Sequence, residues 1–203
     1  MTAKSQAIQG VIEAIIENRR RFEAFCDSLS EEQLMRPVPD STWVVRDFAA
    51  HLDTLDTALL RWFGGVAQGG QADSGRGADG APFDVDAFND AQVVERRSWP
   101  LERIFAEAHE NRRQLIGMMS ELTDEQIEKP MHFAGDAKRS ASDLPLKLFL
   151  AGWAQHDPIH VADMIKALPE RASDAEIVAW LDNPFVHGYQ ALMSAPHGQR
   201  EEA

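Results

Sequence analysis

Two histidines in the last third of the chain have the spacing of a metal-binding pair. His156 and His160 are four residues apart, so on an α-helix they lie one turn from each other on the same face. Two imidazoles placed in this way can reach a single cation. The positions around them recur every three or four residues, which is typical of the buried seam of a bundle helix. This seam consists of Leu146, Phe149, Trp153, His156, His160, Asp163 and Ala167.

A third histidine, His51, occupies a similar position in an earlier segment. Its seam consists of Val44, Phe48, His51, Leu55, Ala58 and Trp62. Buried polar groups cost free energy unless they have partners, and one metal ion would partner all three imidazoles. Three neutral imidazoles suit a divalent first-row metal such as zinc or nickel, and three protein ligands leave a position open for water or substrate, as in catalytic sites. The alternative is three core histidines that are hydrogen-bonded separately.

Three further residues are expected around this centre. Asp47 lies one helical turn before His51 and Asp163 one turn after His160, so each is placed to hydrogen-bond and orient a ligand. Trp153 precedes His156 by three residues and should line the pocket. The segment lacks the glutamate of the zincin motif, and the chain shows no Glu-x-x-His di-iron pattern. The sequence also shows no recognisable pattern of a serine or cysteine nucleophile with its own base.

The helices that must position these residues follow from the apolar periodicity. We expect helices over residues 5–28 and 43–63, the second capped by Ser41 or Thr42. A third helix with a break at Pro100 is expected over 84–97 and 99–121, and a fourth, kinked at Pro158, over 142–168. These four predict an all-α, up-down four-helix bundle. Residues 19–21 are expected on the outside of the first helix.

The remaining segments are expected to be short or irregular. Residues 64–82 are rich in glycine and predict a loop, residues 130–140 predict another, and no strand is expected. A fifth, shorter helix over 174–194 would cap the bundle or form a homodimer contact. The expected organisation is a metal-binding bundle over residues 1–170 with a C-terminal helical extension of the same domain over 171–203.

The composition argues against several classes of partner. The 203 residues carry 33 acidic and 20 basic side chains, a net charge of −13, which repels nucleic acid and anionic membrane surfaces. A single cysteine, Cys26, rules out an internal disulfide, and its place on the first apolar stripe indicates a buried thiol. One cysteine and no apparent signal peptide or membrane-spanning run favour a reducing cytoplasm.

The motifs resemble those of the DinB-like superfamily, which includes the N-terminal domain of mycothiol-dependent maleylpyruvate isomerases. Trp43, Asp47 and His51 are similar to its second-helix motif Trp-x-x-x-Asp-x-x-x-His, and His156 to His160 resemble its fourth-helix motif. Residues 86–89 and 96–98 resemble the start of its third helix. The resemblance covers residues 5–168 and implies a four-helix bundle with a three-residue divalent metal site. In the isomerase the position of His156 holds a glutamate, and a second C-terminal domain follows.

The resemblance implies a metal-dependent enzyme that binds a low-molecular-weight thiol, such as mycothiol, bacillithiol or glutathione. Such an enzyme transfers the thiol to an electrophilic substrate or uses it in an isomerisation. The metal would lower the pKa of the thiol and supply a thiolate. Three alternatives remain. The first is a hydrolase that uses metal-bound hydroxide, and the second is a bundle that binds metal or small molecules without catalysis. A structural helical protein with hydrogen-bonded core histidines is the third.

Overall fold

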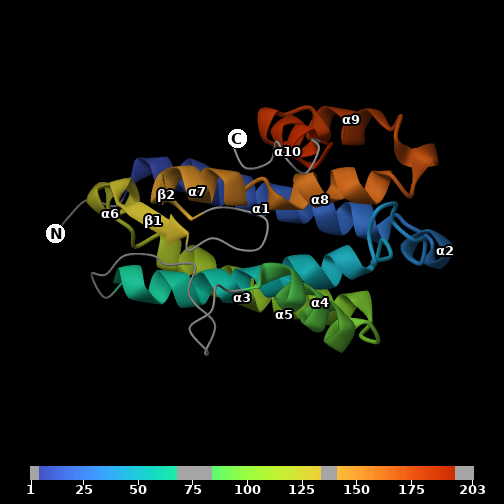
Figure 1. Cartoon of the computed structure of the whole chain (residues 1–203), viewed down its shortest axis with the longest axis horizontal. Helices are drawn as coiled ribbons and strands as arrows, with labels where there is room; N and C mark the ends of the chain where they lie inside the picture. Colours follow the sequence, from blue (N-terminus) through green and yellow to red (C-terminus); the bar gives the residue numbers. More distant parts are fainter. Residues whose placement is uncertain (1–4, 68–83, 134–140, 195–203) are drawn as a thin grey trace.

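Four long helical segments pack into the predicted bundle in a computed structural model, which describes residues 5–67, 84–133 and 141–194. Figure 1 shows α1 beside α7 and α8 in one layer, and α3 beside α5 in the other, with α4 flanking α3. The all-α, up-down four-helix bundle is therefore confirmed. Its helices are α1 Gln6–Asp27, α3 Asp47–Ala67, α4 Val85–Arg96, α5 Leu101–Met119, α7 Leu146–Trp153 and α8 His156–Ile165.

Shorter elements connect and extend these helices. The connecting elements are α2 Glu31–Leu34, α6 Asp124–Glu128, β1 Pro130–Phe133, β2 Ser142–Pro145 and the 3-10 turn Pro169–Arg171. The expected C-terminal helix is two helices, α9 Ala175–Leu181 and α10 Pro184–Ser194, which stack on α8 (Figure 1). The break falls before Pro184, where the Asn183 side-chain oxygen accepts hydrogen bonds from the backbone N–H groups of Phe185 and Val186 and so starts the second helix.

The second bundle helix begins later than expected. Residues 43–45 pair with the chain at residues 36–38 instead, through bonds from Val38 N–H to the Trp43 carbonyl and from Val45 N–H to the Arg36 carbonyl. These pairings hold the segment extended, so the predicted caps Ser41 and Thr42 are wrong and α3 starts at Asp47. At its other end α3 continues to Ala67, through the first residues of the predicted loop 64–82, whose remainder lies outside the described residues.

A β-hairpin replaces part of the predicted loop and the start of the predicted fourth helix. Its strands are antiparallel, with Met131 opposite Leu144 and His132 opposite Asp143. Pro145 disfavours helical geometry at the preceding residue, so the helix starts at Leu146 rather than at residue 142. Met131, at 3% exposure, anchors the hairpin in the core.

The core is divided into two apolar clusters by a layer of charged side chains. On α1, for example, Ile15 belongs to one cluster and Phe22 to the other, and Arg19 lies between them. Each bundle helix contributes one buried charge to this layer, and the four are Arg19, Asp56, Arg112 and Asp157. We call these four residues the ionic layer. The expectation that Arg19 lies on the outside is wrong, because it is only 5% exposed.

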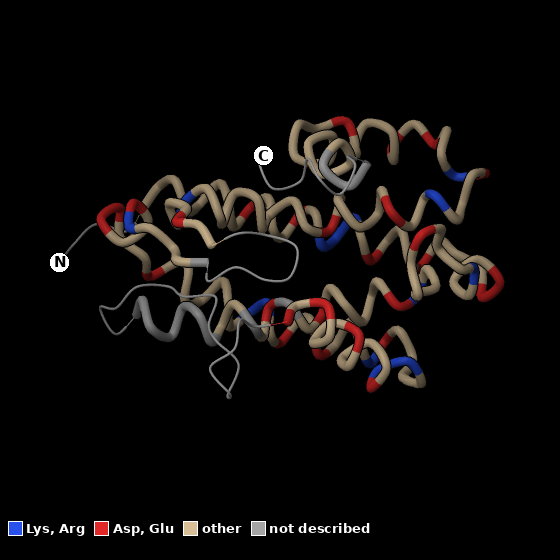
Figure 2. Tube along the Cα trace, viewed as in Figure 1, with Lys and Arg blue, Asp and Glu red and all other residues tan. Residues whose placement is uncertain are grey.

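The acidic residues outside the ionic layer are spread along the bundle. Figure 2 shows acidic positions scattered along the helices rather than gathered at one end. Within the described ranges, no helix has the length and apolar character needed to cross a membrane.

Cys26 is buried in the apolar cluster that contains Phe22, at 1% exposure, as the sequence predicts. Burial raises the pKa of its thiol, because the thiolate would lose its hydration. We therefore expect no reaction of the folded protein with Ellman's reagent, and complete reaction once guanidinium unfolds the chain. Rapid stoichiometric labelling under native conditions would show that this part of the core opens readily.

Candidate metal centre

Three imidazoles converge between two helices of the bundle. His51 comes from α3, and His156 and His160 come from α8. One nitrogen from each ring can be chosen such that all three lie within 4.8 Å of one another. His51 and His160 are buried, and His156 is partly buried. The structure thus brings together all three histidines that the sequence singled out.

The spacing of two of these nitrogens matches what one ion requires. The Nε2 atoms of His51 and His160 are 3.1 Å apart. Two nitrogens bound tetrahedrally at the usual zinc–nitrogen length of about 2.0–2.1 Å are separated by about 3.3 Å. The rings of His156 and His160 stack with centroids 5.0 Å apart, as their spacing of one helical turn predicts. The spacing of His51 and His160 therefore fits a divalent ion, and His156 brings a third nitrogen within 4.8 Å of both.

The protonation of His51 also suits a metal ligand. Burial lowers the pKa of His51 well below its ordinary value, and the neighbouring His160 and His156 lower it further. A neutral imidazole is the form that binds metal. The Nδ1 atom of His51 is buried without a hydrogen-bond partner among the described residues, so this ring is poorly satisfied by the protein alone.

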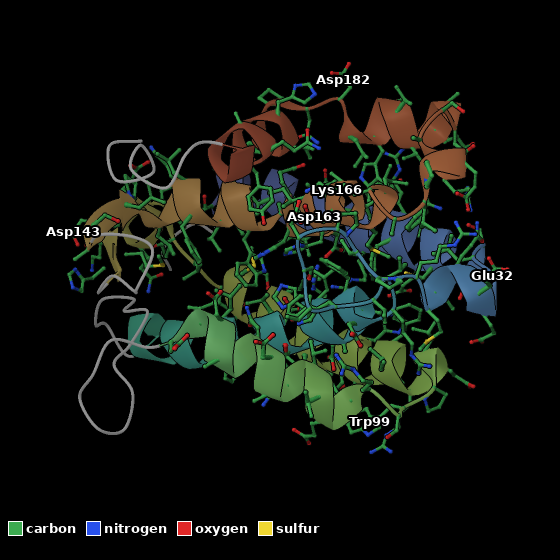
Figure 3. All side chains as sticks on the ribbon, turned by 45° about the vertical axis from the view of Figure 1, so that its right-hand side comes forward. Glu32, Trp99, Asp143, Asp163, Lys166 and Asp182 are labelled. Carbon is green, nitrogen blue, oxygen red and sulfur yellow. The ribbon has the colours of Figure 1, made fainter. Side chains whose placement is uncertain are left out.

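Asp163 lies where it was expected. Its Oδ2 atom is 3.4 Å from Nδ1 of His160, and its Oδ1 accepts a 2.7 Å hydrogen bond from Lys166 (Figure 3). Burial acts to raise the pKa of Asp163, but the hydrogen bonds from His160 and Lys166 outweigh it and leave the pKa below its ordinary value. An ionised carboxylate at this nitrogen favours the tautomer whose Nε2 lone pair faces the other histidines.

Asp47 does not orient His51. Its carboxylate accepts a hydrogen bond from the backbone N–H of Val44 at 3.1 Å and two from Arg97 at 2.8 and 3.3 Å. The predicted bond to His51 is therefore wrong, since that ring's Nδ1 has no partner among the described residues. Because α3 begins at Asp47 itself, the side chain turns back to accept from Val44, which precedes the helix.

Aromatic rings surround the three histidines. The Trp153 ring lies edge-on to His156 with centroids 4.6 Å apart, so it lines the centre as expected. Trp43 packs against His51 at 4.9 Å and Phe48 against His160 at 5.6 Å. Tyr189 of α10 reaches His160 at 6.3 Å. Tyr189 was not predicted, because helical periodicity does not show which helix end meets another.

A residue of α1 satisfies the backbone group that Pro158 leaves without a helical partner. Proline has no N–H group, so the Ala154 carbonyl loses its helical partner and the fourth bundle helix divides into α7 and α8. Asn18 donates to that carbonyl at 2.6 Å, and its own side-chain oxygen accepts from the Trp180 indole at 2.8 Å. The break therefore falls at residues 154–155, before both histidines, and the prediction of a kink between them is wrong in its position. Contacts from α1 and α9 hold the break in place.

Comparisons with known proteins agree with this architecture. The family model for the mycothiol maleylpyruvate isomerase N-terminal domain matches residues 17–146, a stretch that includes His51 and ends before His156. A solved structure of a mycothiol-dependent maleylpyruvate isomerase aligns with a TM-score of 0.58 at 9% identity, over 77% of this chain and 60% of that one. A histidine-to-alanine mutant of such an isomerase aligns equally well at 8% identity.

At these identities the structural matches establish the fold alone, and this chain spans about 60% of the length of the isomerase. A search of curated proteins finds no match. The family match is broader evidence, because it extends over more than half of the 203 residues. It agrees with the resemblance in the second-helix motif and with the bundle described above. The chain belongs to the mycothiol maleylpyruvate isomerase N-terminal domain family.

Proposed function

We propose that this protein is a divalent-metal-dependent enzyme that acts on a low-molecular-weight thiol, with His51, His156 and His160 as the metal ligands. The observation that carries the proposal is the convergence of three imidazole nitrogens within 4.8 Å of one another. Zinc and nickel are the metals we favour, since both accept imidazole ligands. The names of the structurally similar enzymes support mycothiol as the thiol and transfer or isomerisation as the reaction class.

A bound divalent cation would lower the pKa of a thiol beside it and so supply a nucleophilic thiolate at neutral pH. The residues at and around the three histidines favour this chemistry. Three neutral imidazoles leave the cation's charge uncompensated, which favours an anionic partner such as a thiolate. Asp163 holds the His160 ring through Nδ1. Trp43 and Trp153 pack against two of the histidines and shield them from water.

Thiol binding can be followed by spectroscopy. We expect mycothiol, added to cobalt-substituted protein, to produce a sulfur-to-metal charge-transfer band, with bacillithiol and glutathione as comparison thiols. The band should be lost in His156→Ala. If no thiol perturbs the cobalt spectrum at millimolar concentration although cobalt is bound, the thiol part of the proposal fails and the metal site stands alone.

A further inference from the structure

Arg19 connects the two helices that carry the proposed ligands. It lies on α1, and its guanidinium is almost fully enclosed. Nη2 donates to the backbone carbonyl of Leu52 on α3 at 3.2 Å. Nε and Nη2 donate to the two carboxylate oxygens of Asp157 on α8, both at 3.1 Å. One rigid, planar group therefore bonds to α3 and α8 at the same time.

The two contact points directly follow two of the proposed ligands. Leu52 is the residue after His51, and Asp157 is the residue after His156. A shift of α3 relative to α8 at this level would change the separation between His51 and the histidines of α8. The guanidinium fixes that distance, because its donors are held in a planar fork of fixed geometry.

Stability alone does not account for a charge at this position. A buried ion pair is often no more stabilising than apolar residues of the same volume, because both charges lose their hydration. The Arg19 pair is further weakened by its Nη1 atom, which is buried and has no hydrogen-bond partner among the described residues. Asp157 also has a second cation nearby, since Arg112 approaches it at 3.9 Å. Apolar residues at both positions 19 and 157 would fill this part of the layer at no greater cost.

We propose that Arg19 is a positioning residue for the metal centre: it sets the spacing between the ligand-bearing helices α3 and α8. This inference rests on the proposed metal site. Arg19 has no role as a ligand, and its effect is expected in the affinity and the coordination geometry of the bound ion.

The test separates positioning from stability with a charge-neutral double variant, Arg19→Met with Asp157→Leu. Removing both charges together avoids an unpaired buried ion, so the protein should stay folded. Arg19→Lys is the second variant, because it keeps a charge beside Asp157 but lacks the planar fork. Arg20→Met is the matched control, since Arg20 is exposed and pairs with Glu17 on its own helix. Cobalt(II) affinity and the d–d absorption bands are measured for each, after circular dichroism has established folding.

We expect the folded double variant and Arg19→Lys to bind cobalt about 10–100-fold more weakly than the wild type, with shifted d–d bands, as when groups that orient metal ligands are lost. Arg20→Met should match the wild type. Wild-type affinity and bands in either folded Arg19 variant would overturn the inference and leave the metal site intact. Absence of cobalt binding by the wild-type chain would instead overturn the proposed function, and the inference with it.

Discussion

Replacing Asp157 with alanine should lower the free energy of unfolding by about 3–5 kcal/mol, the usual cost of breaking a buried ion pair from one side. Asp157 is 2% exposed and accepts two hydrogen bonds from Arg19. Without the carboxylate, Arg19 keeps a buried positive charge whose remaining acceptor among the described residues is the Leu52 carbonyl. Urea denaturation followed by circular dichroism measures the loss.

The matched control is Glu17→Ala, which removes the carboxylate from a pair with Arg20. That pair lies on the same helix as Arg19 but is exposed, with 68% of the Arg20 side chain and 52% of the Glu17 side chain accessible. Solvent screens this pair, so we expect a much smaller change than for Asp157→Ala. Equal effects of the two alanine variants would contradict the assignment of Asp157 to a buried ionic layer.

Replacing His160 with alanine should weaken divalent metal binding by more than about 100-fold. Loss of a group that merely orients a ligand costs roughly 10–100-fold, and His160 is proposed to bind the ion directly. It is also the ring whose Nε2 lies 3.1 Å from that of His51. Isothermal titration with zinc, in competition with a chelator of known affinity, measures the change.

His109→Ala is the control for this variant. His109 lies on α5, is exposed and contacts Glu23, far in sequence from the three converging histidines. Its removal should leave zinc affinity unchanged. If His109→Ala and His160→Ala weaken binding equally, zinc is held by surface histidines and the proposed centre is wrong.

The fold and the three histidines were predictable because their signals are local and repeated. Each long helix shows apolar residues every three or four positions, and His51, His156 and His160 interrupt two of those seams. A polar residue inside an apolar seam must find a partner, so the seam itself suggests that the rings meet. Tyr189 carried no such signal, because its contact with His160 depends on how α10 packs on α8.

The spacing of apolar residues does place two members of the ionic layer on the core faces of their helices. Arg19 is four residues after buried Ile15 and three before buried Phe22, and so lies on the core face of α1. Asp56 has the same relation to Leu52 and Leu59 on α3. Arginine is seldom buried unless it is paired. Its partner Asp157 is 138 positions away, so the sequence does not reveal the pairing.

The hairpin and the start of α3 depend on backbone pairing between segments, which side-chain periodicity does not report. Apolar periodicity predicts that residues 43–45 begin a helix, but they pair with residues 36–38. Each strand of the hairpin has four residues, too few for an alternating pattern to be distinctive. Asp47 was misassigned for the same reason, because its role follows from the helix beginning at that residue.

The central claim is that His51, His156 and His160 hold one metal ion. Its most direct test is elemental analysis of protein purified without a histidine tag and without added metal, beside the His51→Ala variant purified in the same way. We expect about one zinc or nickel ion per wild-type chain and a large loss of metal in the variant. Wild-type protein that stays free of metal, even after equilibration with zinc and with nickel at neutral pH, would contradict it.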